Sequence, residues 1–200
     1  MKRAGTAKKK AKFVTLGADQ QIDFGGIAKG YTGQKLAELF QEYGVSSALV
    51  SLGGNIQAIG TKPDGSSWKV GIRDPKGGQQ DYIGVLFVEN QAVVTSGGYE
   101  RYFEEDGKTY IHIINPRTGY PADGDLLSVT IVSRDGTLAD GMSTALYIMG
   151  YEKACQFWRQ HREEFNVILV TDDGKIHISE NLKENFQTEC DLEMIESGSE

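Results

Sequence analysis

Short runs of apolar and β-branched residues, separated by glycine and polar residues, recur along the chain and predict short β-strands. The strands expected from them are Phe13–Leu16, Gln21–Phe24, Ala48–Leu52, Asn55–Gly60, Trp68–Arg73, Tyr82–Glu89, Ala92–Thr95, Tyr99–Glu105, Lys108–Ile114, Leu127–Ser133, Val167–Thr171 and Lys175–Ile178. Two of the breaks, Asp106-Gly107 and Asp173-Gly174, are two-residue sequences that favour tight hairpins. We therefore expect at least two β-hairpins.

Three longer segments have apolar residues at helical spacing, and they are Ile27–Tyr43, Leu138–Met149 and Tyr151–Phe165. The residues that share one face of the first segment are Leu36, Leu39, Phe40 and Tyr43, and we expect this face to be buried. Strands and helices come in mixed order along the chain. This order favours a single α+β domain with mixed or antiparallel sheets and packed helices.

Charge and composition divide the chain and exclude some functions. The 200 residues carry a formal net charge of −7, which argues against a nucleic-acid-binding protein. No apolar run reaches the roughly 18 residues of a membrane helix, and Met1–Lys12 is basic without the apolar stretch of a signal peptide. We expect a frayed basic segment at 1–20, a domain at 21–180 and an acidic tail at 181–200 that ends in disorder.

The segment Asp23–Tyr31 places a Gly-Gly turn directly before a helix. Backbone N–H groups at a helix start attract anions, and glycines allow a ligand to come close. Lys29 falls in the first helical turn, where it is either a cation for phosphate or a side chain that extends to solvent from the edge of the apolar face. Asp23 is either a ligand contact or a cap at the end of the preceding strand.

Asp140, Ser143 and Thr144 lie at helical spacing and share one face of an otherwise apolar helix. One carboxylate with two hydroxyls is too few ligands to enclose calcium, but it suits Mg²⁺, which keeps waters and binds substrate phosphate. The alternative is helix capping, with Thr137 as the N-cap and Asp140 in the first turn.

His112 is expected on a hairpin strand, opposite Arg101. A cationic neighbour would disfavour protonation of the imidazole and keep it available as a base near neutral pH. The alternative is a structural histidine. Two glycine-containing segments, Gly53-Gly54-Asn55 and Thr95–Gly98, are either tight turns or places where backbone approaches a ligand.

Five of these motifs occur together, in the order Asp23–Tyr31, Leu52–Ile56, Thr95–Gly97, His112–Gly119 and Asp140–Thr144. In this combination the chain resembles the ApbE-type FAD:protein FMN transferases. The resemblance runs from about Gln21 to about Thr171. It implies a central cleft that binds both FAD and Mg²⁺.

The resemblance also implies roles for single residues of this cleft. Asp140 and Thr144 match magnesium ligands, and Ser143 and the backbone carbonyl of Gly26 match further ligands of the same ion.

Four more residues are assigned by the resemblance to FAD and to catalysis. Asp23 and Lys29 match contacts to FAD, and Ile113 matches a residue beside the flavin nucleotide. His112 matches the base that deprotonates the acceptor hydroxyl.

The implied reaction transfers FMN from FAD to a Thr or Ser hydroxyl of an acceptor flavoprotein through a phosphoester and releases AMP. The expected partners are FAD and this acceptor, with no nucleic acid and with membrane contact only through the acceptor or an anchor. The alternatives are a FAD pyrophosphatase, which gives FMN and AMP, and a flavin-binding module without catalysis. The resemblance favours an extracytoplasmic location, whereas the lack of a visible signal leaves the cytoplasm open.

Overall fold

The computed structural model of the protein describes residues 13–198. Within them the helices are α1 (Ala28–Glu42), α2 (Gly136–Met149), α3 (Tyr151–Gln160) and the 3-10 helix η1 (Glu180–Asn185). The strands are β1 (Ala48–Leu52), β2 (Asn55–Ile59), β3 (Trp68–Arg73), β4 (Tyr82–Val88), β5 (Ala92–Gly97), β6 (Tyr102–Glu105), β7 (Lys108–Ile111), β8 (Leu126–Ser133), β9 (Phe165–Thr171), β10 (Ile176–Ser179), β11 (Phe186–Gln187) and β12 (Leu192–Ile195). None of the described helices combines the length and hydropathy needed to cross a bilayer.

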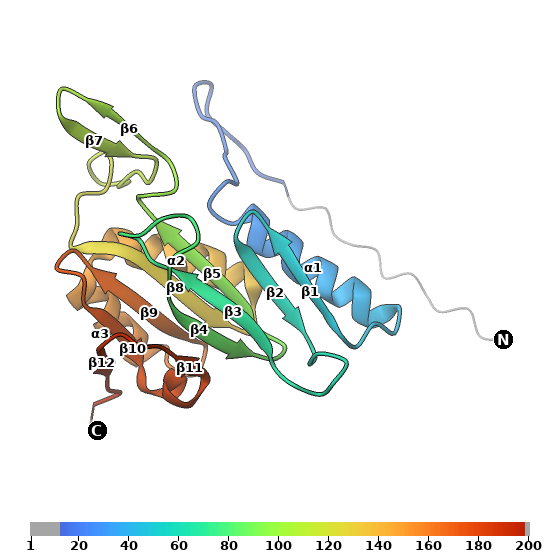
Figure 1. Ribbon diagram of the computed structural model, residues 1–200. Helices are drawn as coiled ribbons and strands as arrows, with labels where there is room; N and C mark the ends of the chain where they lie inside the picture. The colour runs from blue at the N-terminus through green and yellow to red at the C-terminus, as the bar shows by residue number, and fades with distance from the viewer. Residues whose placement is uncertain (1–12, 199–200) are drawn as a thin grey trace.

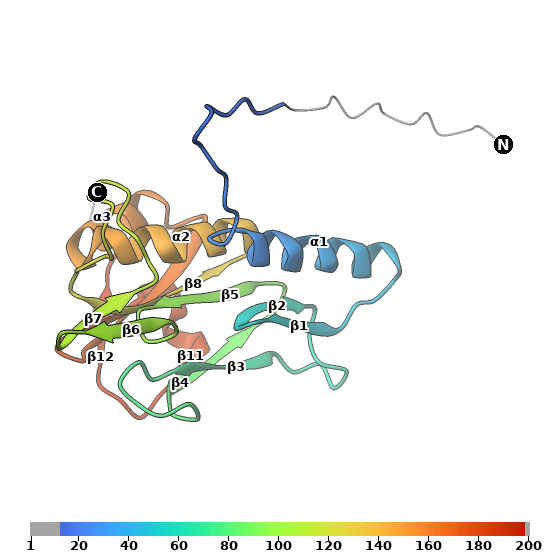
Figure 2. The same cartoon turned by 90° about the horizontal axis from the view of Figure 1, so that it is seen from above.

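The strands form a seven-stranded sheet in the order β1-β2-β5-β8-β9-β10-β12 and a three-stranded sheet in the order β11-β4-β3. All neighbours in the larger sheet are antiparallel except β10 and β12, which are parallel. Figure 2 shows the layers: α1, α2 and α3 cover one face of the large sheet, and β3 and β4 cover the other. The β6–β7 hairpin projects away from this body (Figure 1).

Alternating residues of the central strands supply two separate cores. On β8, Val129 and Ile131 pack toward α2 and α3, whereas Val132 packs toward β3 and β4. On β9, Leu169 belongs to the first core and Ile168 to the second. Because both faces of these strands are buried, their sequences are nearly continuous apolar runs, as expected for the middle of a layered domain.

The helices α1 and α2 cross very closely near their N-termini. A Cβ atom on Gly30 would overlap the carbonyl oxygen of Gly136 and come within 2.5 Å of Asp140 Cβ. The buried face of α1 therefore consists of small residues, Gly30, Gly33 and Ala37.

This packing makes the predicted apolar face of α1 wrong. Leu36 and Phe40 are only half-buried, while Leu39 is 43% and Tyr43 81% exposed. The physical reason is that large side chains on the inner face would separate α1 from α2 and from β2, which α1 also contacts.

Most of the expected strands and helices are confirmed to within a few residues, and the α+β class is confirmed. The β6–β7 hairpin has the predicted register, with Phe103 opposite Tyr110. The expected strands Phe13–Leu16 and Gln21–Phe24 are wrong, because these segments pair with no described strand and are exposed throughout. The helix expected at Tyr151–Phe165 ends at Gln160, and Phe165 instead begins β9.

The acidic C-terminal segment, which the sequence analysis places after the domain, packs onto the domain through residues 182–195. Leu182, Phe186 and Ile195 are buried, and β12 extends the large sheet beside β10. Few apolar residues of this segment are buried, and they are widely spaced in an acidic sequence. The sequence pattern therefore did not indicate that the segment packs against the domain. The basic residues 1–12 lie outside the described part of the chain.

Candidate functional site

A cleft of about 590 Å³ opens between the start of α1, the β1–β2 turn, the end of β5 and one face of α2. It brings together seven of the eight candidate residues from the sequence, which are Asp23, Gly26, Lys29, His112, Ile113, Asp140 and Thr144. The eighth, Ser143, is fully buried behind this surface. The convergence of the Gly-Gly turn with the oxygen-bearing face of α2 is therefore present in the structure.

Asp140 is the most enclosed charged residue of the cleft, with only 5% of its surface exposed. Its Oδ2 accepts a hydrogen bond from the backbone N–H of Gly30 at 2.7 Å. Its Oδ1 has no hydrogen-bond partner among residues 13–198 and remains available to a ligand. The predicted capping alternative is wrong in detail, because the N-cap of α2 is Asp135, whose side chain accepts from the N–H groups of Thr137 and Leu138.

Hydroxyl groups from β5 and α2 meet beneath the cleft. Ser96 Oγ lies 2.8 Å from Ser143 Oγ and 3.1 Å from Thr144 Oγ1. Ser143 also donates to the backbone carbonyl of Asp140 at 2.9 Å. Thr144 thus reaches the cleft while Ser143 supports it from behind, so the geometry favours a supporting role over direct coordination for Ser143.

Lys29, in the first turn of α1, joins this helix to the β1–β2 turn. Its Nζ lies 3.3 Å from the carbonyl oxygen of Gly53. Asp23 accepts a hydrogen bond from the N–H of Gly25 at 2.7 Å and so shapes the Gly-Gly turn, although no strand precedes it. Both side chains are exposed within the cleft, where the ammonium group of Lys29 can meet an anionic ligand.

His112 follows β7 at the mouth of the cleft and is exposed. Both its backbone N–H and its ring Nδ1 lie 3.1 Å from the carbonyl oxygen of Arg101. A carbonyl can only accept, so Nδ1 carries the proton and Nε2 keeps its lone pair in the neutral ring. Arg101 lies beside His112, as predicted. Arg101 contacts the histidine through its backbone carbonyl oxygen.

Asn55 and Ser96 line the cleft and were not singled out as site residues from the sequence. Asn55 is 6% exposed, and its Nδ2 has no hydrogen-bond partner among the described residues. A buried amide donor without a partner costs free energy unless a ligand accepts from it. Its position directly after Gly53-Gly54 was the available signal, because that turn already indicated a place where backbone approaches a ligand.

The donor set fits a magnesium ion better than other metals. Asp140 Oδ1, Thr144 Oγ1 and the Gly26 carbonyl are hard oxygen donors on one cleft, and the Gly26 carbonyl accepts no hydrogen bond within residues 13–198. No cluster of three or more His, Cys, Asp or Glu side chains suited to a metal occurs in that part of the chain. Magnesium requires fewer protein ligands than calcium or zinc, because it retains water and binds substrate phosphate.

Comparisons with known proteins give the family of the chain. The chain matches the ApbE family over residues 2–169. It is 42% identical over 159 residues to the FAD:protein FMN transferase of Klebsiella pneumoniae (strain 342), covering 80% of this chain and 48% of that protein. It is 44% identical over 170 residues to the enzyme of the same name from Treponema pallidum (strain Nichols), covering 81% of this chain and 47% of that protein.

Solved structures give the same result. The crystal structure of the ApbE protein from Thermotoga maritima has a TM-score of 0.75 at 37% identity, over 82% of this chain and 53% of that one. The flavin transferase ApbE from Vibrio cholerae has a TM-score of 0.71 at 31% identity, over 82% and 52%. The chain spans about half the length of the curated relatives that it matches. On the family match and these relatives, the chain belongs to the ApbE family.

Proposed function

We propose that this protein is a magnesium-dependent FAD:protein FMN transferase that attaches FMN to a Thr or Ser hydroxyl of an acceptor protein. The observation that carries the proposal is the single cleft that holds Asp140, Thr144 and Gly26 together with His112. Its relatives named FAD:protein FMN transferase support the same reaction.

In this reaction the acceptor hydroxyl oxygen forms a bond to the phosphorus on the flavin side of the FAD pyrophosphate. The bridging P–O bond breaks, and AMP leaves with the bond electrons. Asp140, Thr144 and the Gly26 carbonyl would hold Mg²⁺, which when bound offsets the negative charge of the pyrophosphate. Lys29 adds a positive charge at the same cleft.

His112 would take the hydroxyl proton at Nε2. The Arg101 carbonyl holds Nδ1–H, so the ring presents its basic nitrogen away from the hairpin. Positioned general bases contribute on the order of 10²–10⁴-fold in rate. The exposure of His112 allows a hydroxyl on a second protein to reach it.

The test is to incubate the protein with FAD, Mg²⁺ and a set of Thr- or Ser-containing acceptor polypeptides, and to analyse them by intact mass. We expect a mass gain equal to FMN less one water, with one AMP released for each label. His112→Gln should reduce this labelling about 10²-fold or more while FAD binding is retained.

Two other results would replace the proposal. Release of FMN and AMP without any labelled polypeptide would make the protein a FAD pyrophosphatase. Tight FAD binding with neither label nor AMP would make it a flavin-binding module. Equal labelling by wild type and His112→Gln would remove His112 from the role of base.

A further inference from the structure

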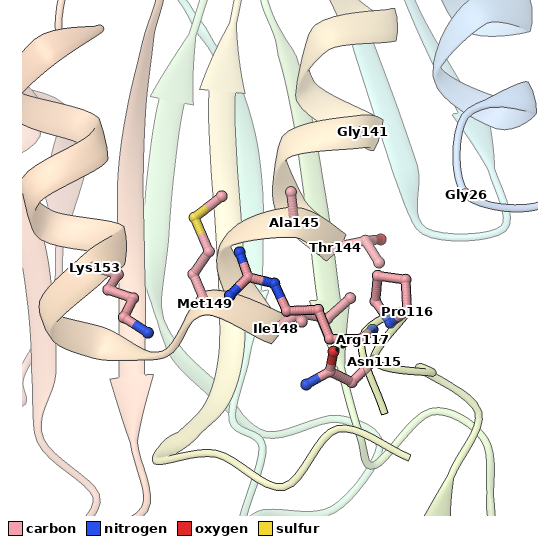
Figure 3. A pocket seen from close by; sticks show the side chains of 10 residues that line it. All are labelled: Gly26, Asn115, Pro116, Arg117, Gly141, Thr144, Ala145, Ile148, Met149 and Lys153. Carbon is pink, nitrogen blue, oxygen red and sulfur yellow. Dashed lines mark hydrogen bonds between the residues drawn. The ribbon is translucent and has the colours of Figure 1, made fainter. Parts of the chain in front are cut away.

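A second cavity, of about 510 Å³, adjoins the cleft, and Gly26 and Thr144 line both. Figure 3 shows it between the outer face of α2 and the turn that contains Asn115, Pro116 and Arg117. We call this cavity the α2 groove. The proposed reaction does not use it, since the candidate FAD contacts Asp23, Lys29 and Ile113 line only the cleft.

The floor of the α2 groove is apolar and open. Gly141, Ala145, Ile148 and Met149 supply it from one side of α2, and Met149 is 38% exposed. A Cβ atom on Gly141 would meet nothing within 4 Å, so its missing side chain leaves room along the helix. From Gly141 to Met149 the helix rises about 12 Å, which an extended polypeptide covers in about four residues.

Two cations border the α2 groove. Arg117 reaches over the outer face of α2, and Lys153 extends from the first turn of α3 (Figure 3). Neither side chain forms an ion pair or a hydrogen bond with any residue of the described part of the chain. In a protein whose net charge is −7, two unpaired cations beside an apolar floor complement a ligand that is both apolar and anionic.

We propose that the α2 groove binds the acceptor polypeptide in an extended form, with an acidic side chain of the acceptor on Arg117 and Lys153. This inference rests on the proposed FMN transfer. In an in-line displacement the attacking oxygen and the leaving oxygen lie on opposite sides of the phosphorus, so the acceptor and the AMP half need separate approaches. The cleft and the α2 groove meet at Gly26 and Thr144 and provide two such approaches.

The segment from 112 to 117 explains how the acceptor meets the base. His112 lines the cleft and Arg117 lines the α2 groove, five residues along the same segment. A polypeptide anchored by its carboxylate at Arg117 can therefore place a nearby hydroxyl at His112. Acceptors with an acidic residue a few positions from the target hydroxyl are the class that this arrangement selects.

The test measures binding directly, by fluorescence anisotropy. The probes are labelled ten-residue peptides with one central Thr, in which a single Asp is moved through the other positions, and each has an Asn counterpart. We expect at least one Asp peptide to bind wild type about tenfold more tightly than its Asn counterpart. Arg117→Glu and Lys153→Glu should each remove this preference, while the Kd for FAD stays within about twofold.

Two matched variants control for charge and for folding. Lys183→Glu makes the same charge change outside both cavities and should bind peptide as wild type does. Gly141→Phe fills the α2 groove without changing charge and should weaken peptide binding, whereas Gly141→Ala should not. Melting temperatures check that each variant is folded.

The outcomes separate this inference from the proposed function. Charge-dependent peptide binding without any FMN transfer would support peptide binding in the α2 groove and contradict the proposed transferase reaction. Equal binding of Asp and Asn peptides, or unchanged peptide binding in Arg117→Glu and Lys153→Glu, would contradict the proposal that the α2 groove binds an acidic acceptor. Weaker FAD binding in these variants would assign the α2 groove to the dinucleotide and overturn the inference as well.

Discussion

The backbone N–H of Gly30, in the first turn of α1, donates to Oδ2 of Asp140 on α2 at 2.7 Å. Ile27, the N-cap of α1, provides no side-chain cap, so a carboxylate from another helix satisfies one of the unpaired N–H groups of α1. The negative charge also lies at the positive end of the α1 dipole. Asp140 therefore joins the two helices as well as presenting Oδ1 for a ligand.

Asp140→Asn separates these two roles. The amide oxygen can still accept from Gly30, so we expect a melting temperature close to that of wild type. The loss of the negative charge should weaken the magnesium site and reduce FMN transfer at least about 10²-fold. Titration of transfer rate against Mg²⁺ checks this, and Asp140→Ala, which also loses the cap, should be less stable by about 1 kcal/mol. A normal Mg²⁺ dependence in Asp140→Asn would contradict the ligand role.

Gly30→Ala tests the close crossing of α1 and α2. The added methyl group would overlap the Gly136 carbonyl and crowd Asp140 Cβ, so the helices must separate. We expect a loss of about 1–3 kcal/mol in the free energy of unfolding, measured in urea, and reduced FMN transfer. Gly141→Ala is the matched control, since its Cβ meets nothing within 4 Å, and it should stabilise the helix by about 1 kcal/mol. Equal unfolding midpoints for the two variants would show that the crossing is not constrained.

Local signals in the sequence were sufficient for much of the fold. The Asp106-Gly107 pair specifies a two-residue hairpin turn through its backbone geometry, and both residues have positive φ. The second hairpin, around Asp173-Gly174, is also present, but its loop has three residues, 172–174. The strands β1 and β3 have the predicted bounds, and β1 ends directly before Gly53. The convergence of Gly26 with Asp140 could not come from local patterns, because the two residues are 114 positions apart in the sequence; it followed from the resemblance.

The features that the sequence did not predict all depend on contacts between residues far apart in the chain. The inner face of α1 is set by the distance to α2, which sequence periodicity does not report, so small residues are buried and Leu39 is not. The C-terminal segment docks through single residues such as Phe186, which pairs β11 with β4 from far along the chain. The orphaned amide of Asn55 is a property of its buried surroundings and is visible only in three dimensions.

That amide makes Asn55 a second test of the cleft. Asn55→Leu removes a buried donor that has no partner in the described structure, so stability should be equal or higher. If the donor serves FAD, the Kd for FAD should rise about tenfold or more. Calorimetric titration with FAD measures this. Gln57→Leu on the same strand is the control, since Gln57 is also buried with an unpaired oxygen but does not line the cleft. Equal FAD affinity in both variants would exclude Asn55 from binding.

His177 provides a test of the fold away from the cleft. It lies on β10 with 5% of its surface exposed, and its Nδ1 lies 3.0 Å from Tyr151 Oη and 3.3 Å from Glu193 Oε2. Burial lowers the pKa of His177 below its ordinary value of 6.5, while the charges of Glu193 and Asp173 act in the opposite direction. The net effect is that folding disfavours the charged imidazole.

The sign of the resulting pH dependence follows from proton binding. Because the folded pKa of His177 is the lower one, the unfolded chain binds more protons as the pH falls below 6.5, and the folded state loses stability there. Well above pH 6.5 both states are neutral at this residue and the full stability is present. His177→Gln should therefore flatten the decline in melting temperature between about pH 7 and pH 5. An unchanged slope in His177→Gln would mean that another group causes the acid sensitivity.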